Sequence, residues 1–236
     1  MEDGEKVKSW YNTFSKNQLE TGVNLRHHTI MNYLYEAGFK SNSKVLEIGC
    51  GIGTLTGLLF QNLPKGKLVA ADISDESIKI AKERIPNADK IDFYVTDMKD
   101  FTYPEKFDFI VLPDVMEHIP VEQHPGLFKT IEKHMHDDSI ILINIPHPKA
   151  LDYIRINTPE KLQIIDQSIG ADTLISNAYA NNLILTYYKA YSIFNEEADY
   201  VLVKFKKNIS YKTLTPLDKN TIIKNKLAAR ANTFFK

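Results

Sequence analysis

The stretch DVMEHIP, residues 114–120, places two acids and a histidine within five positions. Three interpretations fit these side chains. His118 can act as a general base, because the ordinary pKa of histidine is about 6.5, with Asp114 or Glu117 orienting it or the acceptor. Alternatively, these side chains bind Mg²⁺, Mn²⁺ or Zn²⁺ together with His147. In the third interpretation the group is structural, with Glu117 bonded to loop backbone and His118 packed.

A glycine-rich loop, EIGCGIG, lies upstream at residues 47–53. It follows an apolar run and opens a helical one, so its glycines allow a ligand to approach the backbone and the helix N-terminus. The dinucleotide pattern G-x-G-x-x-G would need glycine at position 54, where this chain has Thr54. The acid before the loop, Glu47, would repel a pyrophosphate but suits a cationic ligand. These features favour S-adenosylmethionine, which carries a sulfonium and an ammonium group and no phosphate.

Two further acids stand where later apolar runs end. Asp72 lies near the end of the run 67–73, and a carboxylate there can accept both hydrogen bonds of a ribose. Asp97 ends the run 91–97. Because the carboxyl ends of parallel strands meet at one edge of a sheet, the sequence predicts that these acids and the glycine loop line one ligand site.

Strand and helix signals alternate from residue 44 onward, which is the pattern of βαβ units in a parallel sheet. Five apolar runs predict parallel strands, and two β-rich runs joined by NEEA predict a C-terminal antiparallel hairpin. We therefore expect an α/β, Rossmann-like sheet of seven strands with helices on both faces. The predicted parallel strands cover 44–50, 67–73, 91–97, 107–113 and 139–146, and the predicted helices cover 54–63, 75–85, 122–135, 158–167 and 172–180.

Three parts are predicted along the chain. Residues 1–40 would form an N-terminal helical cap over the ligand edge, 41–207 the α/β domain, and 208–236 a basic C-terminal helix or tail. The segment 204–236 holds nine basic residues and one acid, although the whole chain has a net charge of −1. A basic end of this kind can attract nucleic acid, a membrane or an anionic substrate, or it can be a solvated helix face.

The composition predicts a soluble, cytoplasmic protein. The single cysteine, Cys50, excludes an internal disulfide framework and fits a reducing compartment. No apolar run reaches the roughly 18 residues that cross a bilayer. The charged start MEDGEKVKSW lacks the apolar region of a secretory signal.

The segments VLEIGCGIG, AADIS, VTDM and FDFIVLPDVMEHI together resemble the successive motifs of class I S-adenosylmethionine-dependent methyltransferases. The resemblance covers residues 44–146 by motif and extends to residue 207 by topology. It implies S-adenosylmethionine as cofactor and S-adenosylhomocysteine as product. It also implies a cofactor site, with the methionine moiety held by Glu47, Gly49, Gly51, Gly53, Leu112 and Pro113, the ribose by Asp72, and adenine by Ile73, Asp97 and Met98. Cys50, inside the glycine loop, is a further expected cofactor-binding residue.

In this family DVMEHIP would stand beside the transferable methyl group. We expect methylation of a hydroxyl on a small polar acceptor, such as a sugar or glycan, with His118 as base and Asp114, Glu117 and His147 as further catalytic candidates. Three alternatives stay open: a metal-assisted O-methyltransferase that uses these four residues, an RNA methyltransferase that uses the basic end, and a non-catalytic S-adenosylmethionine-binding module. No added RNA-binding domain is visible in the sequence, which argues against a nucleic-acid acceptor.

Overall fold

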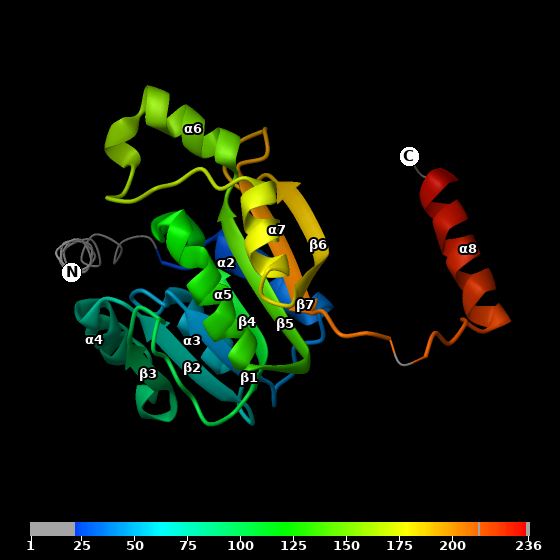
Figure 1. Cartoon of the computed structure of the whole chain (residues 1–236), viewed down its shortest axis with the longest axis horizontal. Helices are drawn as coiled ribbons and strands as arrows, with labels where there is room; N and C mark the ends of the chain where they lie inside the picture. The colour runs from blue at the N-terminus through cyan, green and yellow to red at the C-terminus, as the bar shows by residue number, and fades with distance from the viewer. Residues whose placement is uncertain (1–21, 212, 235–236) are drawn as a thin grey trace.

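Short apolar runs form a seven-stranded sheet in the computed structural model, which describes residues 22–211 and 213–234. The strand order is β3-β2-β1-β4-β5-β7-β6, parallel from β3 to β5 and antiparallel over the last two strands (Figure 1). The strands are β1 (Lys44–Ile48), β2 (Lys67–Asp72), β3 (Asp92–Val95), β4 (Phe107–Pro113), β5 (Met135–Pro146), β6 (Leu183–Tyr191) and β7 (Tyr200–Lys207). The predicted Rossmann-like sheet with its C-terminal hairpin is confirmed.

Helices cover both faces of this sheet, as the sequence predicts (Figure 1). Successive side chains of a strand point to opposite faces, so Leu46 joins one apolar core and Val45 the other. Because both faces are buried, the strands appear in the sequence as continuous apolar runs. One core packs against α5 (His124–Lys133) and α7 (Ala171–Tyr179), and the other against α2 (Leu25–Glu36), α3 (Thr54–Gln61) and α4 (Asp75–Arg84).

The segment after β5 departs from the prediction. A helix that the sequence pattern does not predict, α6 (Pro148–Asn157), follows the strand. The predicted helix 158–167 is wrong, because only η5 (Pro159–Lys161) is helical there. The Asp166 carboxylate accepts a hydrogen bond from the Gln163 N–H at 2.6 Å, which fixes a turn in place of the second helical turn. The rest of this segment is an irregular loop that folds back toward the end of β4.

The N-terminal cap predicted for 1–40 lies partly outside the described residues, which begin at residue 22. Within them, Asn24 caps α2, and His27 completes the capping box. Ile30 and Leu34 are fully buried in the core shared with α3. The helix therefore packs on a face of the sheet, and its first turn reaches the loop after β4. The boundaries predicted at residues 40 and 207 stay predictions.

The basic C-terminal segment contains one more helix, α8 (Lys219–Phe234), which stands apart from the sheet at the end of an irregular stretch (Figure 1). Its first turn contains no acidic residue, and its last turn contains no basic residue. Across the part of the chain that the structure describes, no helix combines the length and the apolar character needed to cross a bilayer.

The N-cap of α3 supplies a test of this packing. Gly53 has a φ of +81°, and a Cβ built on it would lie 2.9 Å from both Ala81 Cβ and Ile85 Cδ1. We expect Gly53→Ala to lower the free energy of unfolding by about 1–3 kcal/mol, because it adds backbone strain and overpacking at one position. Denaturant titration measures the change.

Gly57→Ala is the matched control, since it lies inside the same helix. A Cβ there would be 3.9 Å from Ile85 Cγ1, an ordinary contact, and alanine favours a helix over glycine by up to about 1 kcal/mol. Gly57→Ala should therefore keep or raise the stability. Equal losses in the two variants would contradict the strain argument.

Candidate active site

The glycine loop joins β1 to α3 at the carboxyl edge of the sheet. Gly49, Gly51 and Gly53 have φ values of +75°, +52° and +81°, in the left-handed region that favours glycine. A Cβ built on Gly49 would overlap the side chain of Val115, so the loop that follows β4 passes directly against the glycine loop. The two motifs that the sequence singles out, 47–53 and 114–120, are therefore neighbours in space.

Asp72, at the end of β2, is tied to the glycine loop. Its Oδ2 accepts a hydrogen bond from the Gly51 N–H at 2.8 Å, and its Oδ1 accepts one from the Ser74 N–H at 2.8 Å. Burial raises the pKa of this carboxyl, and these N–H groups offset part of the rise. The side chain is only half-buried, so its carboxylate can accept further hydrogen bonds at the cofactor edge. The predicted ribose-binding role agrees with this position and stays a prediction.

Glu47 lies fully buried in β1, directly before the glycine loop. Burial raises the pKa of its carboxyl to about 8, with an offset from the Thr56 hydroxyl and a smaller rise from the Asp72 charge. Thr56 is close enough to affect this pKa, but neither Glu47 oxygen makes a hydrogen bond of normal geometry within the described residues. An unpaired buried carboxyl under a glycine loop fits a cationic ligand. Together with Asp72 and the loop conformation, it fits S-adenosylmethionine.

The other predicted cofactor residues differ in exposure. Asp97 is exposed, and its carboxylate pairs with Lys99 Nζ at 2.9 Å. Met98 has a φ of +68°, and its side chain is 3% exposed within the core, so it packs inward in this structure. The remaining residues are buried or half-buried near the carboxyl edge, and their roles stay predictions: Cys50, Ile73, Leu112 and Pro113.

His118 lies in η3 (Met116–His118), at the end of the loop after β4. Its ring Nδ1 is 2.6 Å from the Ile165 carbonyl oxygen, to which it donates, and 3.2 Å from Asp166 Oδ1. Its Nε2 is 3.8 Å from Glu117 Oε1. Burial lowers the pKa of His118, but Glu117, Asp166 and the Ile165 carbonyl outweigh that effect and raise it to about 9.

Glu117 is 2% exposed, and neither of its carboxylate oxygens makes a normal hydrogen bond to the described residues. Burial raises the pKa of this carboxyl to about 8, the neighbouring His118 lowers it in part, and Asp114 raises it. Glu117 and His118 therefore compete for one proton near neutral pH. In one arrangement both are charged, and in the other both are neutral.

Asp114 contacts two residues that the sequence analysis misses. Its Oδ2 lies 2.6 Å from Arg26 Nη1 in the first turn of α2, and the same nitrogen donates to the Tyr200 hydroxyl of β7 at 3.2 Å. Burial raises the pKa of Asp114, while Arg26 and His118 lower it. We refer to one group as the β4-end cluster: Arg26, Asp114, Glu117, His118, Asp166 and Tyr200.

His147 has a different position from the other predicted catalytic residues. It is the N-cap of α6, and its Nδ1 accepts a hydrogen bond from the Lys149 N–H at 3.2 Å. Within residues 22–211 and 213–234, no three His, Cys, Asp or Glu side chains are grouped so that they could hold a metal ion. The alternative metal set of Asp114, Glu117, His118 and His147 is therefore not assembled in this structure.

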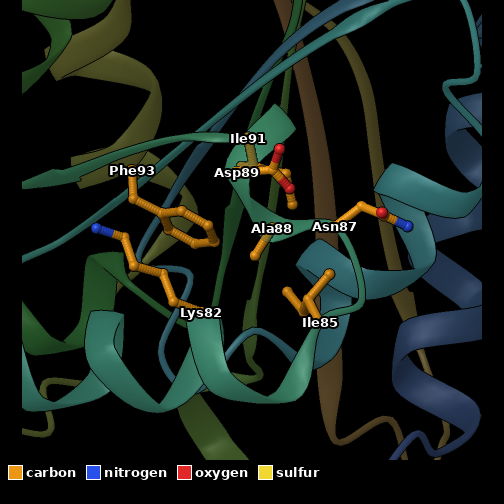
Figure 2. A pocket seen from close by; sticks show the side chains of 7 residues that line it. All are labelled: Lys82, Ile85, Asn87, Ala88, Asp89, Ile91 and Phe93. Carbon is orange, nitrogen blue, oxygen red and sulfur yellow. The ribbon is translucent and has the colours of Figure 1, made fainter.

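A surface cavity of about 560 Å³ lies elsewhere, between the end of α4, η2 (Ala88–Lys90) and the start of β3 (Figure 2). Lys82 and Phe93 stand on one side of it, with the Lys82 Nζ 5.7 Å from the centre of the Phe93 ring. The residues around it come from the end of α4, from η2 and its flanks, and from the start of β3, and none comes from the glycine loop or the loop after β4. The cavity therefore does not belong to the site at the carboxyl edge.

The fold of this chain agrees with that of solved methyltransferases. The magnesium protoporphyrin IX methyltransferase from Synechocystis PCC 6803, bound to S-adenosylhomocysteine, superposes with a TM-score of 0.67 at 16% identity, covering 87% of this chain and 99% of the other. The N-methyltransferase NodS from Bradyrhizobium japonicum, with the same ligand, gives a TM-score of 0.65 at 18% identity over 84% and 98% of the two chains. The fold is that of the class I methyltransferases.

The sequence comparisons identify the domain. Residues 45–138 match the family described as "Methyltransferase domain". A malonyl-[acyl-carrier protein] O-methyltransferase from Priestia megaterium is 32% identical over 84 residues, 36% of this chain and 30% of that protein. A trans-aconitate 2-methyltransferase from an Azoarcus species is 26% identical over 43% of this chain and 38% of its own length. The matches thus span about a third of each of these two relatives. Residues 45–138 therefore match a methyltransferase domain, and the chain around them has the class I methyltransferase fold.

The raised pKa of Glu47 predicts a pH-dependent stability. The folded carboxyl keeps its proton up to about pH 8, whereas the ordinary value is 4.5, so stability falls as the pH rises from 4.5 through 8. Glutamine cannot ionise and removes this contribution. We expect ligand-free Glu47→Gln to lose less stability than wild type between pH 5 and 8, by on the order of 3 kcal/mol, measured by urea unfolding at each pH.

The exposed Glu160→Gln is the control, and its stability should follow that of wild type across the same range. Parallel curves for wild type and Glu47→Gln would show that the buried carboxyl is not the source of the pH dependence.

Proposed function

We propose that this chain transfers the methyl group of S-adenosylmethionine to a hydroxyl of a small polar acceptor, such as a sugar or another polyhydroxylated molecule. One observation carries the proposal: the buried Glu117 carboxylate, two residues after the Val115 that contacts the glycine loop, has no hydrogen-bond donor among the described residues. A buried group that can only accept hydrogen bonds costs free energy until a donor reaches it. An acceptor hydroxyl supplies such a donor.

The bound cofactor supplies an electrophilic methyl group, whose bond to sulfur breaks as the acceptor oxygen bonds to its carbon. A hydroxyl is a weak nucleophile near neutral pH, so a base has to take up its proton as this bond forms. His118 is our candidate. Its Nδ1 donates to the Ile165 carbonyl, and in the neutral ring this leaves Nε2 as the proton-accepting atom. Glu117, 3.8 Å from Nε2, stabilises the ring once it is protonated.

The charges around His118 favour a hydroxyl over an amine or a carboxylate. Glu117, Asp114 and Asp166 would hold a bound amine as its ammonium form, which has no lone pair for attack. The same acids would repel a carboxylate acceptor. The similar proteins include both an O-methyltransferase and an N-methyltransferase, so the preference for oxygen rests on this cluster.

An acceptor panel tests the function. Calorimetry with S-adenosylhomocysteine first measures cofactor-site binding, and release of the same product from S-adenosylmethionine then reports turnover. The panel contains methyl α-glucoside, glucosamine, glucuronate, malonate and a structured RNA. We expect the neutral glucoside to be methylated at least tenfold faster than the charged compounds, because it alone offers only hydroxyl groups without adding charge to the site. Preferred turnover of RNA or of a charged compound would contradict the proposal, and tight binding without any turnover would indicate a binding module.

Replacement of the proposed base tests the mechanism. We expect His118→Gln to reduce kcat by about 10²–10³, the usual contribution of a positioned base. In wild type, kcat should rise from pH 7 to 9, because the base works unprotonated and its pKa is raised to about 9. That rise should be absent in the variant.

The control for this measurement is His136→Gln, which removes a histidine at the amino edge of the sheet, 2.9 Å from Asp108 Oδ1. It should keep both the rate and the pH profile of wild type. Full activity of His118→Gln with an unchanged pH profile would exclude His118 as the base.

A further inference from the structure

The first turn of α2 is joined to the acceptor side of the site by an ion pair. Arg26 Nη1 lies 2.6 Å from Asp114 Oδ2 and donates to the Tyr200 hydroxyl at 3.2 Å. The guanidinium also lies 6.0 Å from the centre of the Tyr200 ring. The side chains of Arg26 and Asp114 are only 26% and 16% exposed. Three elements that are distant in the sequence therefore meet at this pair.

Some polar atoms of this pair lack partners within the described part of the chain. Asp114 has a φ of +52°, in the left-handed region that aspartate adopts more readily than most residues, and its N–H donates to the Asn144 carbonyl at 2.8 Å. Asp114 Oδ1 and Arg26 Nε are buried without a hydrogen-bond partner among the described residues. Because buried ion pairs often stabilise a fold less than apolar residues of the same size, stability alone is a weak reason for this pair. The unpartnered polar atoms favour a role toward a ligand.

Unused donors and unused acceptors both occur around the pair. Asn144 is fully buried; its Oδ1 accepts from the Tyr191 hydroxyl, and its Nδ2 has no partner within the described residues. Glu117 adds two unpartnered oxygens. A hydroxyl donates and accepts, so neighbouring hydroxyls can satisfy groups of both kinds. A carboxylate would face the acids of the cluster, and an ammonium would face the Arg26 guanidinium.

We propose that Arg26 is a specificity-determining residue of the acceptor site. By pairing with Asp114, Arg26 balances the charge on this side of the site. The site therefore binds an uncharged acceptor with neighbouring hydroxyls in preference to a charged one. This inference rests on the proposed function and names the class of acceptor more narrowly. Arg26 acts through Asp114, so it is a positioning residue.

The test neutralises each partner of the ion pair in a separate variant. Arg26→Gln leaves the Asp114 carboxylate without its cation, and Asp114→Asn leaves the guanidinium without its anion. Methyl α-glucoside, glucosamine and glucuronate are titrated, by ligand-detected NMR, into the complexes of each protein with S-adenosylhomocysteine. Wild type should bind the glucoside at least tenfold more tightly than either charged sugar. We expect Arg26→Gln to shift the preference toward glucosamine, and Asp114→Asn toward glucuronate, each by at least tenfold.

Two controls separate recognition from folding. The double variant Arg26→Gln/Asp114→Asn has no net charge at this pair, so its binding preference should return to the uncharged glucoside. Lys67→Gln/Asp92→Asn removes another ion pair, 2.7 Å long, between β2 and β3 at the amino edge of the sheet, and should leave the order of binding unchanged. Thermal melts and the affinity for S-adenosylhomocysteine show whether each variant is folded. If one single variant is unfolded, the sugar preferences of the other single variant and of the double variant test the inference.

The possible results separate this inference from the function on which it rests. An unchanged order of binding in the single variants overturns the role of Arg26, even if wild type methylates the glucoside. If the two single variants show the expected shifts in sugar binding but wild type methylates none of the sugars, the proposed function is overturned and the role of Arg26 is supported. Failure of wild type to bind the glucoside overturns the inference as well.

Discussion

The close approach of two loops at the carboxyl edge of the sheet sets the geometry of the whole site. The loop after β4 passes where a side chain at position 49 would stand, so only glycine allows the contact with Val115. A larger residue there would displace Val115 and with it the loop that carries Glu117 and His118. The rest of the fold supports this contact, because β1 and β4 are adjacent parallel strands with an apolar core on each face.

Burial changes the protonation of two carboxyl groups in the site. The pKa of Glu47 and that of Glu117 are both raised to about 8, so neither carboxyl is held simply as an anion at neutral pH. A cationic cofactor would favour the ionised form of Glu47. A hydroxyl that donates to Glu117 would favour its ionised form, and the ionised carboxylate would stabilise His118 once the ring has taken up the proton of the acceptor. Ligand binding and proton distribution are therefore linked, and the ligand-free site holds polar groups whose partners the ligands would supply.

The sequence predicts those parts of the fold and site whose signals are local. Buried strands read as apolar runs, and the glycine pattern marks a turn at positive φ, so the sheet and the loop 47–53 are predicted well. The helix expected at 158–167 fails because the Asp166 side chain fixes a turn, and because His118 holds the loop by a contact 47 residues away in the sequence. Arg26 and Tyr200, 174 residues apart, meet only in the folded chain, so no sequence pattern reveals them.

The methyltransferase domain match also divides the site in two. It covers residues 45–138, which contain the glycine loop, Asp72 and the DVMEHIP motif, the parts that the resemblance connects with the cofactor and the reacting methyl group. Arg26, Asp166 and Tyr200 lie before or after the match. The relatives named for malonyl-[acyl-carrier protein] and for trans-aconitate match 36% and 43% of this chain. The acceptor has to be inferred from the contacts that these outer segments make with Asp114 and His118, and those contacts favour an uncharged, hydroxyl-rich molecule.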